Sequence, residues 1–340
     1  MAEKSALTPM MVQYMAAKEA HPDTVLFFRM GDFYEMFHDD AIVASRVLGL
    51  TLTSRSKGDD AVPMAGVPHH AVDKYLRQMM EAGYRVAVCD QMEDPRQAKG
   101  IVMREVTRVV TPGTVVEDSF LESRANNFIA VAVSTKAAAG LAWADLSTGE
   151  FLLEVTTPDA LPDALERVGP AESLLPEERM RSDEKFAFPL HGRAVGLRTL
   201  VPDRDFDAAR AAAAVMQHFG VASLDGFGLS ADCPALGAAA ALLRYLAETP
   251  KRAIRHIRPP RLLDTGDFLM IDRASLRNLE IQSTLSGARD TSLVSVLDQT
   301  CTGAGGRLLR QWLVRPLARV EGIRERQASV RAFLEDHLLR

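Results

Sequence analysis

The sequence predicts two α/β domains followed by the beginning of an all-α segment. In the first part, runs typical of strands are interleaved with amphipathic helical patterns, which favours a compact α/β domain. In the second part, three β-rich runs come first and helical patterns follow them. We expect a mixed-sheet α/β domain over residues 1–113, a linker over 114–125, a second α/β domain over 126–250, and the incomplete start of a helical core over 251–340.

The first domain should open with a capped helix. Thr8 and Pro9 have the pattern of an N-cap and a first helical proline, which predicts a helix from about Met10 to Glu19. The other expected elements are a strand over Thr24–Met30, a helix capped by Asp39 or Asp40 and reaching Leu48, a strand over Leu50–Thr53, a polar turn over Ser54–Asp60, a tight loop over Pro63–Gly66, a helix over Ala71–Ala82 closed by Gly83, and strands over Tyr84–Asp90 and Glu105–Thr111.

The second domain should begin with a three-stranded meander. The expected strands are Asn127–Ser134, Leu141–Leu146 and Glu150–Thr156, with Ser147-Thr148-Gly149 as a hairpin turn. Three strands followed by β/α units suggest an RNase H-like sheet. Helices are expected near Asp159–Val168, Asp205–Phe219 and Cys233–Glu248, and in the last segment over Arg273–Ser286, Leu293–Asp298, Gly306–Val314 and Val320–Leu334.

Composition excludes several protein classes. A hydrophobic fraction of 47% is typical of a globular chain and excludes a mainly disordered one. The three cysteines lie far apart without a C-x-x-C pair, which favours reduced thiols over a disulfide or zinc framework. The first residues lack the apolar core of a signal peptide, and no apolar run approaches the ~20 residues of a membrane span. We therefore expect a soluble, cytoplasmic protein.

The charge is unevenly distributed along the chain. The net charge is −5 overall, −4 over residues 1–120, −7 over residues 121–249 and +6 over residues 250–340. The arginine-rich last segment is compatible with phosphate contacts, and equally with a solvated helical surface that carries internal ion pairs. Contact of the acidic first segment with nucleic acid would have to be local.

Phe27–Ala41 is the stretch with the clearest functional pattern. The turn formers Gly31 and Asp32 end an apolar run, and an aromatic side chain and a carboxylate follow at Phe33 and Glu35. In an extended segment these two side chains share a face, so the ring could enter a base stack while the carboxylate reaches a base edge. The plainer interpretation is a strand that turns into a helix, with Phe33 and Phe37 in the core.

A resemblance decides between these interpretations. The blocks MGDFYEMF, VPMAGVPHHAVDKYL, VAVCDQMEDP and REVTRVVTPGT occur in the order found in the mismatch-recognition domain of the MutS family of DNA mismatch repair proteins, which this segment resembles. The similarity continues through WADLSTGEF and DRASLRNLEI, over nearly the whole chain. The Phe-x-Glu pair of that family falls on Phe33 and Glu35.

The resemblance implies a function and its residues. Phe33 would be a wedge that enters the minor groove at mispaired or unpaired bases and kinks the duplex, and Glu35 would contact the mismatched base. Arg55, Met64 and Arg108 are further DNA-binding candidates, because these regions of the family lie along the DNA. Each has an ordinary alternative: a solvated arginine, a core methionine and a surface strand residue. Tyr34 should point the other way, into the core.

Cofactors and partners also follow from the resemblance. The expected partners are double-stranded DNA with mismatches or small loops, MutL through the second domain, and a second copy of the full-length chain. ATP and magnesium are implied for an ATPase domain outside these residues, and we expect neither enzyme activity nor a cofactor in this segment. Residues 302–307, TGAGGR, lack the lysine and hydroxyl of a phosphate loop and are interpreted as a glycine turn between helices.

Rival functions rest on fewer residues. A relative that binds other DNA structures would be marked by loss of the Phe-x-Glu pair, and both residues are present. A metal-dependent nuclease would use Asp145 and Glu150, for which only the fold analogy argues. The adjacent His69 and His70 could suggest a metal, but neighbouring histidines on a helix point apart and no partner has ligand spacing.

Overall fold

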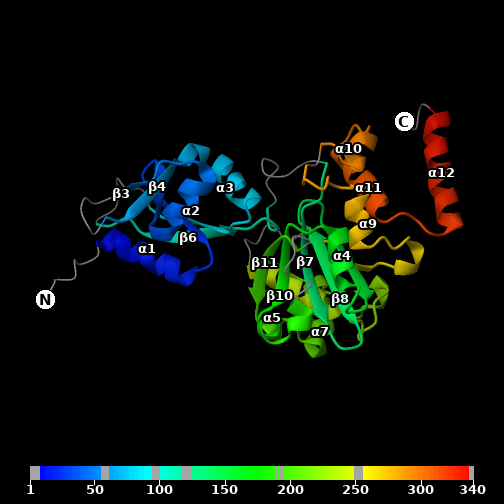
Figure 1. Cartoon of the computed structure of the whole chain (residues 1–340). Helices are drawn as coiled ribbons and strands as arrows, with labels where there is room; N and C mark the ends of the chain where they lie inside the picture. Colours follow the sequence, from blue (N-terminus) through cyan, green and yellow to red (C-terminus); the bar gives the residue numbers. More distant parts are fainter. Residues whose placement is uncertain are drawn as a thin grey trace. The chain divides into compact units, whose positions relative to one another are not determined.

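The computed structural model describes residues 8–54, 61–93, 100–115, 124–187, 190, 195–248, 256–288 and 290–336. The chain divides into two compact units. The first comprises residues 1–120 and 246–253, and the second comprises residues 121–245 and 254–340. Each unit contains one six-stranded sheet, so the described residues form the α/β architecture that the sequence predicts (Figure 1).

The first unit is a mixed sheet with helices on both faces. The strand order is β3-β4-β2-β1-β5-β6, and β1 and β5 are its parallel pair. Helix α1 lies on one face, and α2 and α3 lie on the other (Figure 1). The elements are α1 Pro9–Ala20, β1 Val25–Met30, β2 Phe33–Phe37, α2 His38–Leu48, β3 Thr53–Ser54, β4 Pro63–Pro68, a 3-10 turn His69–Ala71, α3 Val72–Glu81, β5 Val86–Gln91 and β6 Arg104–Val110.

A buried polar group ties α1 to the sheet. Thr8 caps α1 as predicted by accepting a hydrogen bond from the Met11 amide. One turn further, the Tyr14 hydroxyl donates to Asp40, whose carboxylate also accepts from the Leu26 amide and from Lys18. The full set of donors explains why this carboxylate tolerates burial.

Three predictions for the first unit were wrong. Pro63–Gly66 is part of strand β4 and not a loop, because it pairs with both β2 and β3. The strand expected over Leu50–Thr53 is reduced to Thr53–Ser54, because the Leu50 amide turns back to the Ser45 carbonyl and terminates α2. Neither Asp39 nor Asp40 caps α2, because β2 runs directly into the helix and Phe37 occupies the N-cap position.

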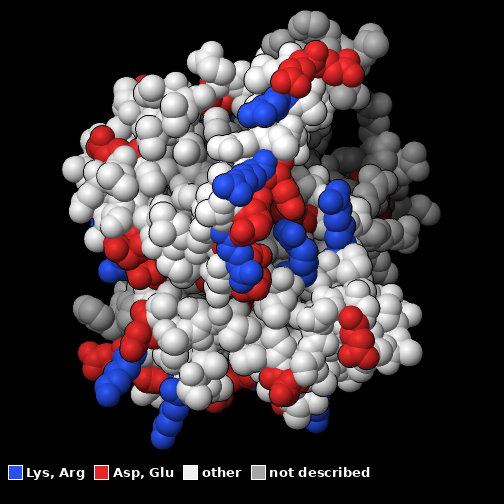
Figure 2. All heavy atoms as spheres, turned by 90° about the vertical axis from the view of Figure 1, so that its right-hand side faces the viewer, with Lys and Arg blue, Asp and Glu red and all other residues white. Residues whose placement is uncertain are grey.

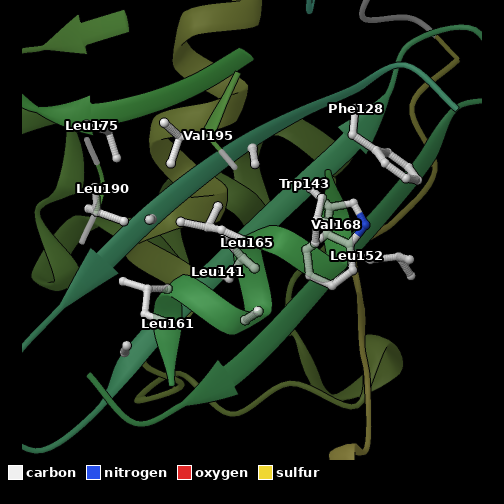
Figure 3. Packing of buried hydrophobic residues seen from close by; sticks show 14 of the residues in the cluster. Phe128, Leu141, Trp143, Leu152, Leu161, Leu165, Val168, Leu175, Leu190 and Val195 are labelled. Carbon is white, nitrogen blue, oxygen red and sulfur yellow. The ribbon is translucent and has the colours of Figure 1, made fainter. Parts of the chain in front are cut away.

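The second unit is built on the predicted meander. Strands β7 Phe128–Ser134, β8 Ala139–Asp145 and β9 Glu150–Thr156 are antiparallel, and β10 Glu172–Pro176 and β11 Leu197–Val201 continue the sheet in parallel beyond β7. This order agrees with the RNase H-like expectation. Helix α4, Leu161–Val168, packs its apolar face on the sheet, with Leu161 and Leu165 beside Leu141 and Trp143 (Figure 3).

The remaining elements of the second unit are mainly helical. They are α5 Glu177–Ser182, α6 Glu184–Ala187, a 3-10 turn Asp203–Phe206, α7 Ala208–Phe219, a 3-10 turn Asp225–Phe227, α8 Leu236–Glu248, β12 Arg261–Leu262, a 3-10 turn Thr265–Asp267, α9 Arg273–Asn278, α10 Leu293–Leu297, α11 Gly303–Val314 and α12 Val320–Glu335. Within the described ranges, no helix has the length and apolar character required to span a bilayer.

Three predictions for the second unit also need correction. Residues after 250 are not purely helical, since β12 pairs with β9. The helix expected over Arg273–Ser286 ends at Asn278, shortly before Glu280 takes a left-handed conformation with φ 49°. The glycine turn expected at 302–307 is instead the start of α11, which Thr302 caps by accepting from the Gly305 amide at 3.1 Å.

Candidate nucleic-acid interface

The candidate site is built on the hairpin of β1 and β2. Gly31 and Asp32 form its two-residue turn, which places Phe33 directly opposite Met30. Gly31 has φ +59°, a conformation that glycine adopts without steric cost. Because β2 lies between β1 and β4, Phe33 is also opposite Pro68. The ring is therefore carried by a strand that is supported on both sides.

Phe33 is exposed, whereas the other aromatic residues of β1 and β2 are buried. Its side chain is 48% exposed, whereas Phe37, which lies further along β2, is fully buried. Tyr14 of α1 covers Phe37 at a ring-centroid distance of 5.0 Å. Among the described phenylalanines and tyrosines of the first unit, Phe33 is the one classed as exposed. The expectation that Phe33 and Phe37 both lie in the core thus holds only for Phe37.

Glu35 lies beside Phe33 on the same face of β2. It is half-buried and stands opposite Phe28 on β1 and Gly66 on β4. A Cβ atom placed on Gly66 would lie 3.8 Å from the Glu35 Cγ and 4.0 Å from the Phe33 Cδ1. Gly66 therefore places no side chain of its own beside Glu35 and Phe33.

Tyr34 points to the opposite face, as predicted. It is 3% exposed, and its hydroxyl donates to the Asp90 carboxylate. Burial, followed by this hydrogen bond, raises the pKa of Tyr34 above the ordinary tyrosine value. Because side chains alternate along β2, Tyr34 makes its polar contact inside the unit. The exposed Phe33 and the half-buried Glu35 lie on the opposite face.

Arg104 is a neighbour that the sequence did not indicate. It lies on β6, where its guanidinium donates to the Arg29 carbonyl at 2.7 Å and stands 5.2 Å from the centre of the Phe28 ring. Burial lowers the pKa of Arg104, and the negative charge of Glu35 acts against that shift. Arg104 therefore places a positive charge near Glu35, and although it begins the block REVTRVVTPGT, only Arg108 of that block was predicted to bind DNA.

The two further DNA-binding candidates that the structure describes, Met64 and Arg108, are not gathered around Phe33. Met64 packs against the α1 side of the core, which favours the core interpretation of this residue. Arg108 is opposite Val88 on β5 and its guanidinium lies 3.9 Å from Asp73 of α3, on the face that Tyr34 occupies. Arg55 lies outside the described residues.

The acids considered for a nuclease have structural partners. Asp145 is fully buried and accepts hydrogen bonds from Asn126, from the Asn127 amide and from Ser147, which together fix the turn after β8. Burial raises the pKa of Glu150, and Gln311 donates to its carboxylate at 3.2 Å. Within the described ranges, no group of three or more histidine, cysteine or acidic side chains is arranged to hold a metal.

The face shown in Figure 2 does not carry one continuous basic surface. There, lysine and arginine residues lie interspersed with acids. Ion pairs join arginines to acids in the second unit, such as Arg319 with Asp267 at 3.0 Å and Arg124 with Asp298 at 3.7 Å. This arrangement favours the solvated, internally paired surface over an extended phosphate-binding surface.

Comparison with known proteins gives three consecutive family matches. The family models described as MutS domain I, MutS domain II and MutS domain III match residues 8–119, 127–258 and 274–340. Similar proteins named DNA mismatch repair protein MutS include one from Symbiobacterium thermophilum, 42% identical over 98% of this chain and 39% of its own length. One from Myxococcus xanthus is 44% identical over 96% of this chain and 37% of its own length. The chain thus spans less than two fifths of these relatives.

Proposed function

The chain belongs to the MutS family, and from this premise we propose that it recognises mispaired or unpaired bases in double-stranded DNA, with Phe33 as wedge and Glu35 as polar contact. The observation that carries the proposal is the exposure of Phe33 on a doubly paired strand, next to a half-buried carboxylate. An aromatic ring on a stiff support can enter a base step and kink the duplex, at a cost of roughly a few kcal/mol in unstacking.

The energetic basis of selectivity is the cost of deforming DNA. A mismatched step is easier to unstack and bend than a paired step, so a wedge favours it without reading the sequence. Glu35 adds a second contribution. Its negative charge is repelled by phosphates in any duplex, whereas a mismatched base offers it a hydrogen-bond partner. Repulsion disfavours ordinary duplex, and the hydrogen bond compensates only at the mismatch.

The test compares binding of mismatched and matched duplexes by variants of the chain. Phe33→Ala should lose stacking worth about 1–3 kcal/mol at the mismatch, with little change in the free energy of unfolding. Phe333→Ala is the matched control, because Phe333 is also an exposed phenylalanine, 54% accessible, but lies on α12 in the other unit. Equal losses of mismatch binding in the two variants, or unfolding of Phe33→Ala, would refute the wedge.

Glu35→Ala should behave differently from Phe33→Ala. Binding to matched duplex should rise because a charge facing phosphates is removed, and the ratio of mismatched to matched affinity should fall. If both affinities fall by the same factor, Glu35 positions the DNA and does not discriminate. Arg108→Gln is a useful comparison, since Arg108 lies on the opposite face from Glu35 and pairs with Asp73.

We further propose the partners and cofactors of the family for the longer protein. ATP and magnesium would bind in a region beyond these residues, two copies would pair, and residues 126–250 would contact MutL. The net charge of −7 over residues 121–249 supports a protein-binding role for that segment, because it disfavours phosphate contact. Hydrogen-exchange protection of this segment by DNA alone, in the full-length dimer, would contradict it.

A further inference from the structure

The turn between β1 and β2, which directly precedes Phe33, is held at both of its carbonyl groups. The turn residues are Gly31 and Asp32. The carbonyl of Gly31 accepts a hydrogen bond from the Arg29 side chain. The carbonyl of Asp32 accepts one from the His69 amide at 2.8 Å. The two peptide groups that set the direction of Phe33 therefore each have a donor from outside the turn.

Both donors belong to residues that contact the ring of Tyr34. Arg29 is directly opposite Tyr34 on β1, and its guanidinium lies 5.5 Å from the centre of the Tyr34 ring. His69 follows β4, and the centre of its ring lies 5.6 Å from that of Tyr34. Because side chains alternate along β2, these contacts lie on the face of the sheet opposite Phe33. Tyr34 thus contacts the two residues that hold the turn.

Tyr34 is itself fixed by the interior of the unit. Its side chain is buried, and its hydroxyl donates to one oxygen of the Asp90 carboxylate on β5. The other oxygen of Asp90 accepts from the Thr107 hydroxyl on β6 at 2.7 Å. The Phe27 ring of β1 lies 6.4 Å from the Tyr34 ring, centre to centre. A continuous set of contacts therefore runs from β6 through Tyr34 to the turn that carries the exposed ring.

We propose that Tyr34 is a positioning residue for the wedge: through Arg29 and His69 it holds the turn in one conformation and so fixes the orientation in which Phe33 enters a base step. A group that is ordered before binding loses less conformational entropy in the complex, which raises affinity. A residue that only fills the core would affect the stability of the unit and not the entry of the ring. The role of Tyr34 presupposes the proposed wedge function of Phe33, and the experiment separates the two.

The test measures insertion of the ring separately from affinity. The full chain is titrated into a duplex that contains an unpaired thymine with the fluorescent base 2-aminopurine beside it. The fluorescence of 2-aminopurine rises when this base is unstacked, so the plateau at saturating protein reports how far the wedge enters. A variant whose only defect is lower stability still reaches the wild-type plateau well below its melting temperature. Phe33→Ala should abolish the rise, and a wild-type plateau in this variant would refute the wedge function itself.

Arg29→Met tests the contact between Tyr34 and the turn. It removes the donor to the Gly31 carbonyl, and should lower the plateau by about half or more and weaken mismatch binding about 2- to 10-fold, the factor that corresponds to one hydrogen bond. Arg46→Met is the matched control, because Arg46 is another arginine of the first unit that contacts a tyrosine, donating to the Tyr84 hydroxyl at 3.1 Å. A wild-type plateau in Arg29→Met, or an equal fall in Arg46→Met, would overturn the positioning role.

Two substitutions of Tyr34 separate its ring from its hydroxyl. Tyr34→Phe keeps the ring against Arg29 and His69 and should retain most of the wild-type plateau. Tyr34→Leu removes the ring and should lower the plateau as Arg29→Met does. Both variants lose the hydrogen bond to Asp90, so that loss does not distinguish them. Equal plateaus in the two folded variants would overturn the role of the ring. If the buried Tyr34→Leu does not fold, Arg29→Met decides, because Arg29 is only half-buried.

Discussion

At the residue scale, one local pattern makes the side chains of Phe33 and Glu35 more exposed than those of their neighbours on β2. Alternation along β2 places them on one face, where Tyr14 of α1 packs against Phe37. The shared face follows from spacing, but the exposure of Phe33 was predicted only from the family resemblance, because spacing alone favoured the core interpretation. Arg104 does not follow from spacing, because its approach to Glu35 depends on the β5–β6 register and on the irregularity between Val88 and Cys89. The local sequence pattern does not reveal how two strands pair.

Gly66 provides a residue-scale prediction about the site. Gly66→Ala should leave folding and mismatch binding nearly unchanged, because the added Cβ would make ordinary contacts of 3.8 Å and 4.0 Å with Glu35 and Phe33. Gly66→Val adds two more methyl groups to the same space and should displace one of the two side chains. We expect lower discrimination between mismatched and matched duplex with a nearly unchanged melting temperature. Equal discrimination by both variants would show that this surface does not contact DNA.

Cys89 provides a second prediction at this scale. Burial, followed by the charge of Asp90, raises the pKa of the Cys89 thiol to about 12. Its neutral form therefore contributes stability that is present below the ordinary cysteine pKa of about 8.5 and is lost as the pH rises toward 12. Urea unfolding should show wild type losing stability relative to Cys89→Ala over this range. Iodoacetamide should modify the exposed Cys301 and leave Cys89 unmodified until unfolding, and early labelling of Cys89 would contradict its burial.

At the element scale, proline and glycine explain two of the errors of sequence interpretation. Pro63–Gly66 has turn residues but forms part of β4, since pairing on both edges outweighs local preference. Gly303–Gly306 has poor helix propensity but forms the first turn of α11, where Thr302 supplies the cap. The short parallel strands β10 and β11 have no alternating pattern to reveal them, because pairing in the assembled sheet defines them.

The turn between β8 and β9 gives the element-scale prediction. Gly149 has φ +73°, and a Cβ there would lie 2.3 Å from the His256 carbonyl oxygen. Gly149→Ala should destabilise the second unit by about 2–4 kcal/mol, combining backbone strain with the clash. Gly220→Ala is the control, since Gly220 has φ +66° and an added Cβ would meet no described atom within 4 Å, so it should cost only about 1 kcal/mol. Equal costs by urea unfolding would show that the His256 contact relaxes.

At the scale of the whole molecule, charge and the wedge make separable contributions to DNA binding. Residues 1–120 have a net charge of −4 and residues 121–249 a net charge of −7, so most of the chain repels phosphates. Part of the net charge of +6 over residues 250–340 is neutralised in ion pairs such as Arg315 with Glu154. Affinity for a mismatch should therefore depend more on the stacked ring than on counterion release.

The salt dependence of DNA affinity tests whether the stacked ring contributes more than phosphate contacts. Each neutralised phosphate contributes a slope of about −0.9 to a plot of log affinity against log salt, so a few local contacts predict a slope of roughly −1 to −3 for this chain. Phe33→Ala should shift the whole line to lower affinity and leave its slope unchanged, because the ring carries no charge. Arg181→Gln, which removes a 72% exposed arginine side chain in the other unit, should change neither quantity. A slope steeper than about −5 would require an extended basic surface. A change of slope in Phe33→Ala would mean that the ring positions phosphate contacts and does not act only by stacking.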